Sequence, residues 1–555
     1  MMTEEKNSIA PGDKQRRSMS LLPSLLLLGG ITEFLYILVL ALTSLPGLHF
    51  MSTPLMSAWS WTLAPSHWLF PSAWTIKSAT GSTEQYDWLH AILFAIVLFA
   101  LIGTYVLAIL VALRRKNMVN APSRWFLVIL GAVLVFSLTL LFQPTLLSDD
   151  VFSYIFSGRM LSIYHVDPLN TIPAQFPGDP YLQWVIAGRN TTNIYGPLWL
   201  YIASLLVTFS NNPVVTLLLF KGVAILSHII NCLLLWAILG KIAPTRRLLG
   251  TLLYAWNPLI LLELAGSGHS DGVLITLFLL ATWLYVQNKG RWRELAVIVI
   301  LGFAISMNFI ALLIAPLFFW FLVRSEHNVT RSLWGFCWRM CITLFIAALV
   351  SFPLWRGEST FFALTSAVDM SHFEHSPVGL LTQPTRWFFG LVAQWANFPP
   401  VMQPTAAADT TLRASTIFIF ALIFFHLFGK VRHATTTIGG MRYSPDADQQ
   451  MNLPGFDVLL DSWYGAVFWY LVLLSGWFWP WYVLWALWIV ALRRFDGRTM
   501  TILLLSCTAL LSYPLQAFAG TPIAEYQSLL VFGIPLIYIV LNRMWWKERH
   551  RPLYE

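Results

Sequence analysis

Two adjacent carboxylates, Asp149 and Asp150, follow an apolar stretch of the chain that ends at Phe142. This position places them at a membrane surface and not within hydrocarbon. Paired carboxylates there could remove the proton from a hydroxyl nucleophile, or could bind a divalent cation beside a phosphate. If the two side chains lie close together, their repulsion raises the pKa of one of them. The plainer alternative is that they cap the following helix and favour its dipole.

The two aspartates open a long polar and aromatic segment. Tyr154 and its apolar neighbours recur at roughly helical spacing, with Arg159 among them, which indicates a short amphipathic helix lying along the interface. The turn sequence Gly178-Asp179-Pro180 that follows cannot cross a bilayer. A loop of this length in a compact chain is usually functional. We therefore predict a large outer catalytic loop over residues 144–212.

Two further motifs could belong to the same site. The sequence from Gly266 to Asp271, Gly-Ser-Gly-His-Ser-Asp, joins two apolar runs and would bring His269 and Asp271 to one face of a tight turn. Its glycines permit close approach of a ligand, although a plain hairpin connection explains it equally well. The sequence from Phe478 to Tyr482, Phe-Trp-Pro-Trp-Tyr, is either an aromatic-belt turn or a surface that stacks on a sugar ring or holds an isoprenoid chain.

Ionisable residues also fall inside the apolar runs, namely Glu33, Lys221, His228 and Glu263. Charges at such positions usually face a protein interior or a wet cavity. Lys221 and Glu263 both fall toward the outer ends of their predicted helices. We expect these two to form a structural ion pair.

The composition defines the class of protein that must position these groups. The chain has 555 residues, of which 57% are hydrophobic and only 11% charged, values that exclude an ordinary soluble globular domain. It contains about fourteen apolar runs near the ~20 residues that a transmembrane helix needs. We predict an all-α, polytopic transmembrane helical bundle. The formal net charge of +8 comes from short clusters between the runs, so we expect no nucleic-acid partner.

These basic clusters predict the orientation. With a cytoplasmic N-terminus, the strong clusters, such as Arg246-Arg247 and Arg493-Arg494, all fall inside. This assignment requires Leu198 to Phe209 to be a re-entrant or surface helix on the outer side. It also requires Leu295 to Val323 to make two passes. The polar motifs then converge on the outer face.

The predicted organisation has three parts. A cytoplasmic N-terminal tail covers residues 1–20, an integral-membrane domain covers 21–546, and a cytoplasmic C-terminal tail covers 547–555. The membrane domain contains the outer loop at 144–212 and a polar cytoplasmic insertion at 429–462. The cysteines all lie in apolar runs, which indicates neither a disulfide framework nor a metal site.

In their order along the chain, the motifs resemble the bacterial polyprenol-phosphate-mannose-dependent α-1,6-mannosyltransferases, integral-membrane glycosyltransferases of the GT-C class. The resemblance covers roughly Arg124 to Leu541. The matching motifs are Asp149-Asp150 with Tyr154 and Gly158, Asp167-Pro168, Tyr195-Gly196-Pro197, Asn257-Pro258, Gly268-His269-Ser270-Asp271 and Pro480-Trp481-Tyr482.

The resemblance implies a GT-C fold whose outer loop carries interfacial helices and opens with the catalytic base. The matching position here is Asp150, with Asp149 as its neighbour. The substrate-binding residues we expect are Tyr154, Arg159, Tyr195, His269, Asp271, Trp481 and Tyr482. Related chains often have a lysine where this one has Ser306-Met307-Asn308. A donor-phosphate contact would then come from Arg159, Arg356 or Arg386, and His269 or an arginine would offset the charge of the leaving phosphate.

The implied function is transfer of a sugar, mannose by the resemblance, from a polyprenyl-phosphate donor to a lipid-linked or polysaccharide acceptor. The reaction would be an inverting displacement at the extracytoplasmic face of the cell membrane, among membrane lipids. No cofactor is expected, and a divalent cation is compatible with the site but not required. One rival is a lipid or glycolipid flippase or transporter, which the one-sided clustering of ionisable residues disfavours. Another is a surface-glycan polymerase or ligase, which differs mainly in acceptor size.

Overall fold

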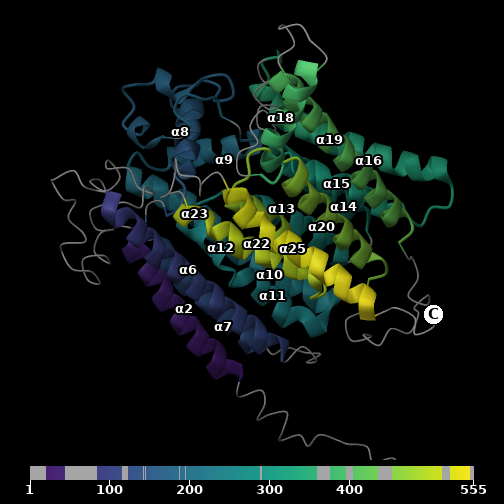
Figure 1. The fold of residues 1–555 in the computed structure, drawn as a ribbon, viewed down its shortest axis with the longest axis horizontal. Helices are drawn as coiled ribbons and strands as arrows, with labels where there is room; N and C mark the ends of the chain where they lie inside the picture. The colour runs from purple at the N-terminus through teal and green to yellow at the C-terminus, as the bar shows by residue number, and fades with distance from the viewer. Residues whose placement is uncertain are drawn as a thin grey trace, which may run out of the picture.

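The computed structural model describes residues 21–43, 84–114, 123–141, 143, 146–186, 188–193, 195–287, 290–358, 376–395, 404–434, 453–515 and 526–549. Within these ranges the regular structure is entirely helical, and the all-α prediction is confirmed (Figure 1). The predicted tail at 1–20, most of the predicted insertion at 429–462 and the end of the C-terminal tail lie outside the described residues.

Eight helical segments of the described chain are long and apolar enough to cross a membrane, or nine if a bent pair counts as one span. They contain α2 (Leu21–Thr43), α6 (Glu84–Leu113), α7 (Ser123–Leu141), α10 (Pro213–Ile242), α16 (Val329–Ser351), α19 (Pro404–Arg432), α20 (Phe456–Leu473) and α22 (Gly497–Leu510) with α23 (Ser512–Leu515). The chain is thus a polytopic helical membrane protein. The predicted number of about fourteen spans is not confirmed.

Shorter helices complete the bundle. They are α11 (Arg247–Ala255), α12 (Pro258–Leu261), the π-helix η5 (Leu262–Gly266), α13 (Asp271–Gln287), α14 (Arg291–Met307), α15 (Ala311–Leu322), α18 (Gly379–Trp395), α21 (Leu484–Leu492) and α25 (Gln527–Arg549). Short 3-10 turns lie at η2 (Pro173–Gln175), η3 (Leu182–Trp184), η4 (Pro244–Arg246), η6 (Phe352–Leu354) and η9 (Pro480–Val483).

Helices α14 and α15 form a hairpin. Thr343 in the middle of α16 donates to the carbonyl of Ile298 in α14, and one turn earlier in both helices Arg339 donates to Glu294 at 2.6 Å. These two contacts show that α14 and α16 run parallel. Helix α15 then returns, because its C-terminal end packs against the first turns of α16. The chain therefore reverses direction between α14 and α15, but neither helix is long and apolar enough to count as a candidate span, so the predicted two passes between Leu295 and Val323 stay a prediction.

The predicted outer loop contains helices α8 (Asp150–Ser162) and α9 (Pro197–Thr208), which pack together at one end of the bundle (Figure 1). They cross closely at Gly158, where a Cβ atom would lie 2.7 Å from the carbonyl carbon of Ala203. Helix α9 does not meet the length of a candidate span, as expected for the re-entrant or surface helix. Helix α8 differs from the sequence interpretation, because nearly every residue from Val151 to Met160 is buried and no face is left for lipid.

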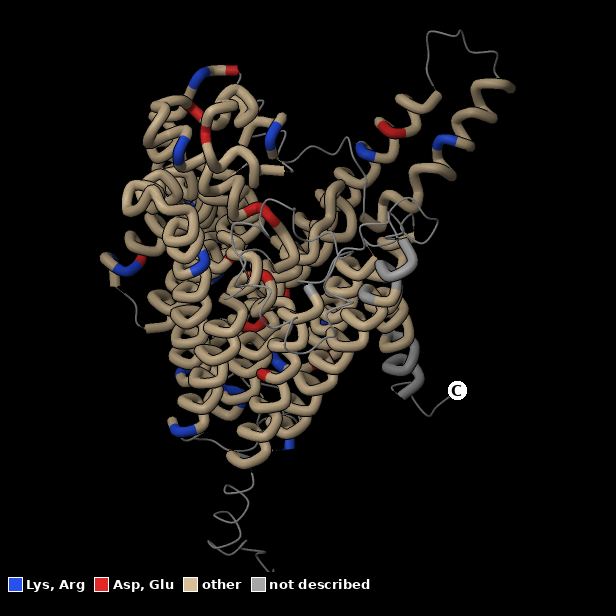
Figure 2. Tube along the Cα trace, turned by 90° about the vertical axis from the view of Figure 1, so that its left-hand side faces the viewer, with Lys and Arg blue, Asp and Glu red and all other residues tan. Residues whose placement is uncertain are grey.

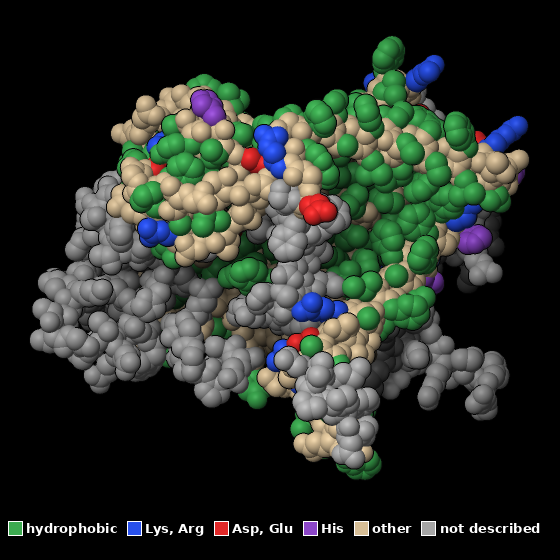
Figure 3. Space-filling view, turned by 90° about the horizontal axis from the view of Figure 1, so that it is seen from above, with side chains coloured by type: hydrophobic (Ala, Val, Ile, Leu, Met, Phe, Trp, Pro, Cys, Tyr) green, Lys and Arg blue, Asp and Glu red, His purple; other side chains and the backbone are tan. Residues whose placement is uncertain are grey.

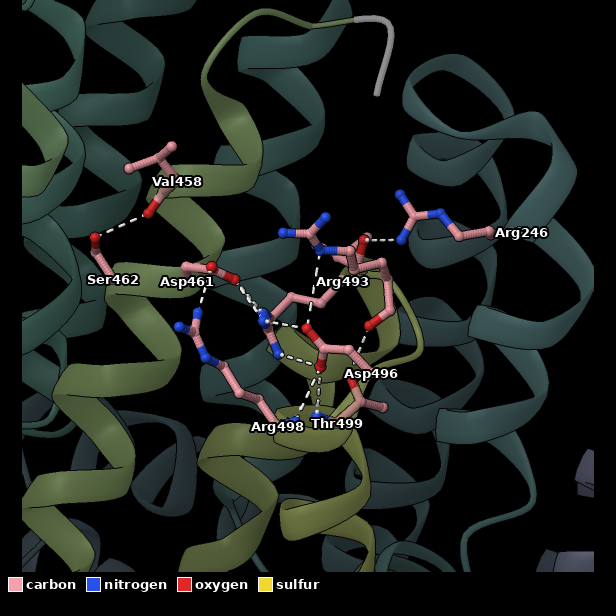
Figure 4. Close-up of polar contacts among 10 residues, drawn as sticks. Arg246, Val458, Asp461, Ser462, Arg493, Asp496, Arg498 and Thr499 are labelled. Carbon is pink, nitrogen blue, oxygen red and sulfur yellow. Dashed lines mark hydrogen bonds and ion pairs between the residues drawn. The ribbon is translucent and has the colours of Figure 1, made fainter. Parts of the chain in front are cut away.

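Lys and Arg residues lie toward both ends of the molecule, and one group of them lies at the end of the bundle opposite α8 (Figure 2). Arg493 there lies 2.5 Å from Asp461 and 3.1 Å from Asp496, and Arg498 also pairs with Asp461 (Figure 4). A carboxylate shared by two arginines fixes the starts of α20 and α22 relative to each other. These contacts make this end of the bundle a connected polar layer.

Apolar side chains face outward along the sides of the bundle. Seen from the α8 end, a broad apolar surface extends beside the α8 region (Figure 3). Helix α16 alone exposes Trp334, Phe345 and Leu349, with 73%, 66% and 60% of their surface accessible. A soluble protein rarely exposes such a continuous apolar area, whereas a membrane protein presents it to acyl chains.

Candidate active site

A broken helical segment carries the central histidine of the site. The Asn257 side chain accepts from the backbone amides of Leu259 and Ile260, and Pro258 occupies the first turn of the new helix. The chain bends by 49° at this break and continues into the π-helix η5. Gly268 has φ +78°, a left-handed conformation that glycine adopts without steric cost. The turn that follows directs His269 back into the protein.

His269 lies fully buried between two carboxylates. Its Nδ1 is 3.2 Å from the hydroxyl of Tyr154 and 4.0 Å from Oδ2 of Asp150. On the other side, its Nε2 is 3.3 Å from Oε2 of Glu263. The ring of Trp481 stacks on the imidazole, with 4.2 Å between centroids. The predicted outer loop, the glycine-rich turn and the aromatic turn therefore meet at this histidine.

Glu263 is the member of the site that sequence reasoning missed. Its carboxylate accepts from the hydroxyl of Tyr513, and both side chains are fully buried. The predicted ion pair with Lys221 is wrong. Lys221 donates instead to the carbonyl oxygens of Leu140, at 3.0 Å, and Gln143. The physical reason is that the carbonyl of Leu140 at the end of α7 has no partner within its own helix and needs a donor, as does the carbonyl of Gln143 just beyond it.

Asp150 is the carboxylate of this cluster that reaches solvent, with 19% of its side chain exposed. Burial raises the pKa of Asp150, the cation at His269 opposes this rise, and the charges of Asp149, Glu263 and Asp271 add to it. The resulting pKa is about 6. A carboxylate of this kind is ionised at neutral pH but retains more basicity than an ordinary aspartate.

The carboxylates around His269 favour its protonated form. Burial by itself lowers the pKa of His269, but the carboxylates of Glu263, Asp150 and Asp271 outweigh it, so that the pKa is raised above the usual value. When protonated, the imidazole places a positive charge next to Asp150. This charge limits how far the pKa of Asp150 rises.

Helix capping does not explain the paired aspartates. Asp149 occupies the N-cap position of α8, yet its side chain makes no capping hydrogen bond. The amide of Asp150 is instead within 3.2 Å of the hydroxyl of Ser148. The structure therefore does not support side-chain capping by Asp149, whereas Asp150 lies in the first turn of α8, where its charge favours the helix dipole.

Comparison with known proteins agrees with this arrangement. Residues 55–324 match the family described as Alpha-(1->6)-mannopyranosyltransferase, N-terminal domain. Over 328 residues, 54% of this chain and 60% of the relative, the sequence is 26% identical to Alpha-(1->6)-mannopyranosyltransferase A of Mycobacterium tuberculosis. Residues 55–324 are thus similar to the alpha-(1->6)-mannopyranosyltransferase family, a match that covers just under half of the chain. The resemblance predicted from the motifs is confirmed at the level of the family.

A second relative is Alpha-(1->6)-mannopyranosyltransferase A of Corynebacterium glutamicum, which is 27% identical over 185 residues. That match covers 33% of this chain and 36% of the relative. The chain thus spans less than two thirds of the length of both relatives. The family match includes Asp150, Glu263 and His269, whereas Trp481 and Tyr513 lie beyond it and join the site through the fold.

The aromatic residues expected from the family resemblance surround the same cluster. Asp271 accepts from Nε1 of Trp485 at 2.6 Å, and the ring of Tyr482 stacks on Trp485 at 4.4 Å. The ring of Tyr195 meets Tyr154 edge to face at 4.6 Å. Most of the predicted site residues are therefore brought together in space.

Arg159 is the exception. Its guanidinium lies 2.8 Å from Asp179 and 4.2 Å from the centre of the Tyr181 ring, and the side chain is buried. It tethers α8 to the Asp179 turn and does not face the cluster. Arg386, another candidate for the donor phosphate, makes two hydrogen bonds to Asp409. Arg159 is therefore engaged by a carboxylate of the outer loop and Arg386 by a carboxylate of α19.

The site is rich in carboxylates, but they do not form a metal-binding arrangement. In the part of the chain that the structure describes, no group of three or more His, Cys, Asp or Glu side chains could hold a metal ion. Hydrogen bonds from Tyr513 and Trp485 use oxygens of Glu263 and Asp271. The carboxylate of Asp150 is the one in this cluster that stays accessible to solvent.

Proposed function

We propose that this protein is an integral-membrane mannosyltransferase that uses a polyprenyl-phosphate-linked mannose donor and a lipid-linked or polysaccharide acceptor. The observation that carries this proposal is the cluster of Asp150, His269 and Glu263. It is built within the segment that matches the alpha-(1->6)-mannopyranosyltransferase family and lies at one end of an apolar helical bundle.

The chemistry proceeds in a single displacement. Asp150 accepts the proton of the acceptor hydroxyl as that oxygen forms a bond to the anomeric carbon of mannose. The bond between this carbon and the donor phosphate oxygen breaks, and polyprenyl phosphate leaves with the bonding electrons. The step inverts the anomeric centre, so an α product requires a β-linked donor. No second carboxylate is needed as a nucleophile, in contrast to a retaining glycosidase.

His269 serves this reaction as a positioning residue. Its ring is fully buried beneath Trp481, so it acts on Asp150 and not on the sugar. Glu263 keeps it cationic, and the cation maintains Asp150 as a base that works near neutral pH. Tyr195 and Tyr482 are half-buried beside the cluster and offer aromatic faces to the sugar.

The membrane setting favours a lipid-linked donor. A polyprenyl tail needs an apolar environment, while its phosphate and sugar must lie beside Asp150 at the interface. We place this site on the extracytoplasmic face, because the basic residues that the positive-inside rule assigns to the cytoplasm lie at the opposite end (Figure 2).

The donor class is tested with purified protein in nanodiscs. Radiolabelled polyprenyl-phosphate mannose and a lipid extract as acceptor should yield a labelled product that α-mannosidase digests. Asp150→Asn serves as the inactive control. Labelled GDP-mannose without lipid intermediates should give little product, and efficient transfer from it would refute the proposed donor.

A further inference from the structure

A second site lies at the end of the bundle opposite Asp150. A cavity of about 580 Å³ opens between the end of α19 and the starts of α20 and α22. The last turns of α19 contribute His426, Lys430 and His433 to its lining, and the other two helices contribute Asp461 and Arg498. Three helices thus surround an open space with mostly basic side chains.

The charges around this cavity do not balance. Its carboxylate, Asp461, pairs with both Arg493 and Arg498, so its negative charge is more than compensated (Figure 4). Among the described residues, no side chain forms a hydrogen bond or an ion pair with Lys430 or with the two histidines of the lining. An exposed lysine ammonium therefore faces the open space next to a fixed arginine. This arrangement attracts an anion.

More positive charge lies behind the arginines. Arg246 is buried, with 5% of its surface accessible, and its Nη1 is 3.5 Å from the carbonyl oxygen of Leu492. Its Nε and Nη2 have no hydrogen-bond partner in the part of the chain that the structure describes. Arg493 and Arg494 act on it as neighbouring like charges, and Asp457 and Asp496 offset part of this repulsion. The local excess of cations therefore extends beyond the cavity wall.

An apolar stripe leads along α19 into the cavity. Phe418, Leu422 and Phe425 expose 63%, 55% and 74% of their surface. They follow one another at spacings of four and three residues, and Gly429 and His433 continue the same helical face into the basic region. A Cβ atom at Gly429 would meet nothing within 4 Å, so the helix leaves open space there. The ligand that fits has an anionic head and apolar chains.

We propose that this cavity binds the headgroup of an anionic glycerophospholipid from the cytoplasmic leaflet, with the acyl chains along the exposed face of α19. Lys430 and Arg498 donate charge-assisted hydrogen bonds to the lipid phosphate. Basic pockets between transmembrane helices on the cytoplasmic side favour such headgroups. This binding is independent of the transfer reaction at Asp150.

Native mass spectrometry of protein purified from mixed lipid tests the proposal. Wild-type protein should retain phosphatidylglycerol in preference to phosphatidylcholine. Replacing Lys430, His426 and His433 by Gln should weaken this retention by at least about five-fold, the effect of one lost surface cation. The matched control is Lys241→Gln, which removes a lysine bonded to Gln287 at the end of α10 and should leave retention unchanged.

A photoactivatable phosphatidylglycerol gives a second readout that does not depend on a variant. It should crosslink to the α19 peptide that contains residues 418–433, and phosphatidylcholine should compete poorly. Equal retention of phosphatidylglycerol by the triple variant and the wild type would overturn the proposal. Displacement of the lipid by inorganic phosphate as effectively as by phosphatidylglycerol would overturn the lipid as occupant, because it would show a site for the phosphate group alone.

Discussion

At the scale of single residues, the properties of Asp150 arise from its neighbours. Burial raises its pKa, and three carboxylates raise it further, while His269 is the one cation among the groups that act on it. An exposed aspartate would be ionised at neutral pH but would be a weak base. A buried aspartate with no cation nearby would stay protonated at neutral pH. The imidazolium at 4.0 Å keeps Asp150 between these limits.

Replacing His269 should therefore shift the pH profile. In His269→Gln the cation is lost, so the pKa of Asp150 rises above about 6 and the acid limb of turnover moves to higher pH. The measurement is kcat against pH with a lipid-linked donor. Tyr154→Phe is the matched control, because it removes the hydroxyl 3.2 Å from Nδ1 and keeps every charge. An unchanged acid limb in His269→Gln would refute the positioning role.

At the scale of elements, the turn between η5 and α13 determines where the histidine lies. Gly268 adopts φ +78°, and a Cβ atom there would lie 3.2 Å from Cγ of Lys221 and 3.4 Å from Cγ2 of Val151. Lys221 is itself fixed to the end of α7 by its hydrogen bonds to two carbonyl oxygens. The turn, α7 and α8 therefore hold one another in position, and a change at the turn reaches Asp150 through its neighbour Val151.

Gly268→Ala should lower both stability and activity. The left-handed conformation costs about 1–2 kcal/mol for alanine, and the new methyl group pushes on Lys221 and on the start of α8. Gly357→Ala is the control, since Gly357 has φ +72° with nothing within 4 Å of its Cβ position. Thermal unfolding should show a loss for both variants that is larger for Gly268→Ala, and only Gly268→Ala should lose transfer activity. Equal activity of the two variants would contradict the proposed coupling.

The sequence predicted this level of structure well where a short motif determines the geometry. The helix of 198–209 and the convergence of the outer turns were predictable, because prolines and charge patterns are local signals, whereas the break at Asn257-Pro258 was not predicted. The role of Glu263 was not predictable. Its partners His269 and Tyr513 are 6 and 250 residues away along the chain, and only the π-helix turns Glu263 toward both.

Two other differences have the same origin. Arg159 was expected to face the substrate, but its partner Asp179 lies in a turn whose position depends on the whole loop. The sequence predicts that helix α8 is amphipathic, yet α9 and the following turns bury its polar face as well. A pattern along one helix does not reveal which neighbours cover it. Such tertiary contacts decide which polar residues remain available for chemistry.

At the scale of the whole molecule, the two ends of the bundle differ in the charged groups that they hold. One end holds buried carboxylates around His269, and the other holds the arginine layer of Arg493 and Arg498 (Figures 2 and 4). This asymmetry agrees with the orientation expected from the positive-inside rule. In this orientation, the proposed sugar transfer would take place on the outer face and the proposed lipid binding on the inner face.

Cysteine labelling tests the orientation. In a background without the four native cysteines, Asn190→Cys should react with an impermeant maleimide added to intact cells, because Asn190 is exposed in the α8–α9 loop. Arg494→Cys, at a side chain that is 55% exposed, should react only after the membrane is permeabilised. The opposite pattern would place the candidate active site on the cytoplasmic face.

The most direct test of the account is the rate of transfer by Asp150→Asn. Asparagine keeps the size and much of the hydrogen bonding of the aspartate but cannot accept the proton. Turnover should fall by roughly 10²–10⁴-fold while donor binding and folding persist. Asp149→Asn is the matched control, and it should retain most activity with an acid limb at lower pH, because the Asp149 charge raises the pKa of Asp150. Near-normal turnover of Asp150→Asn would contradict the assignment of Asp150 as the general base.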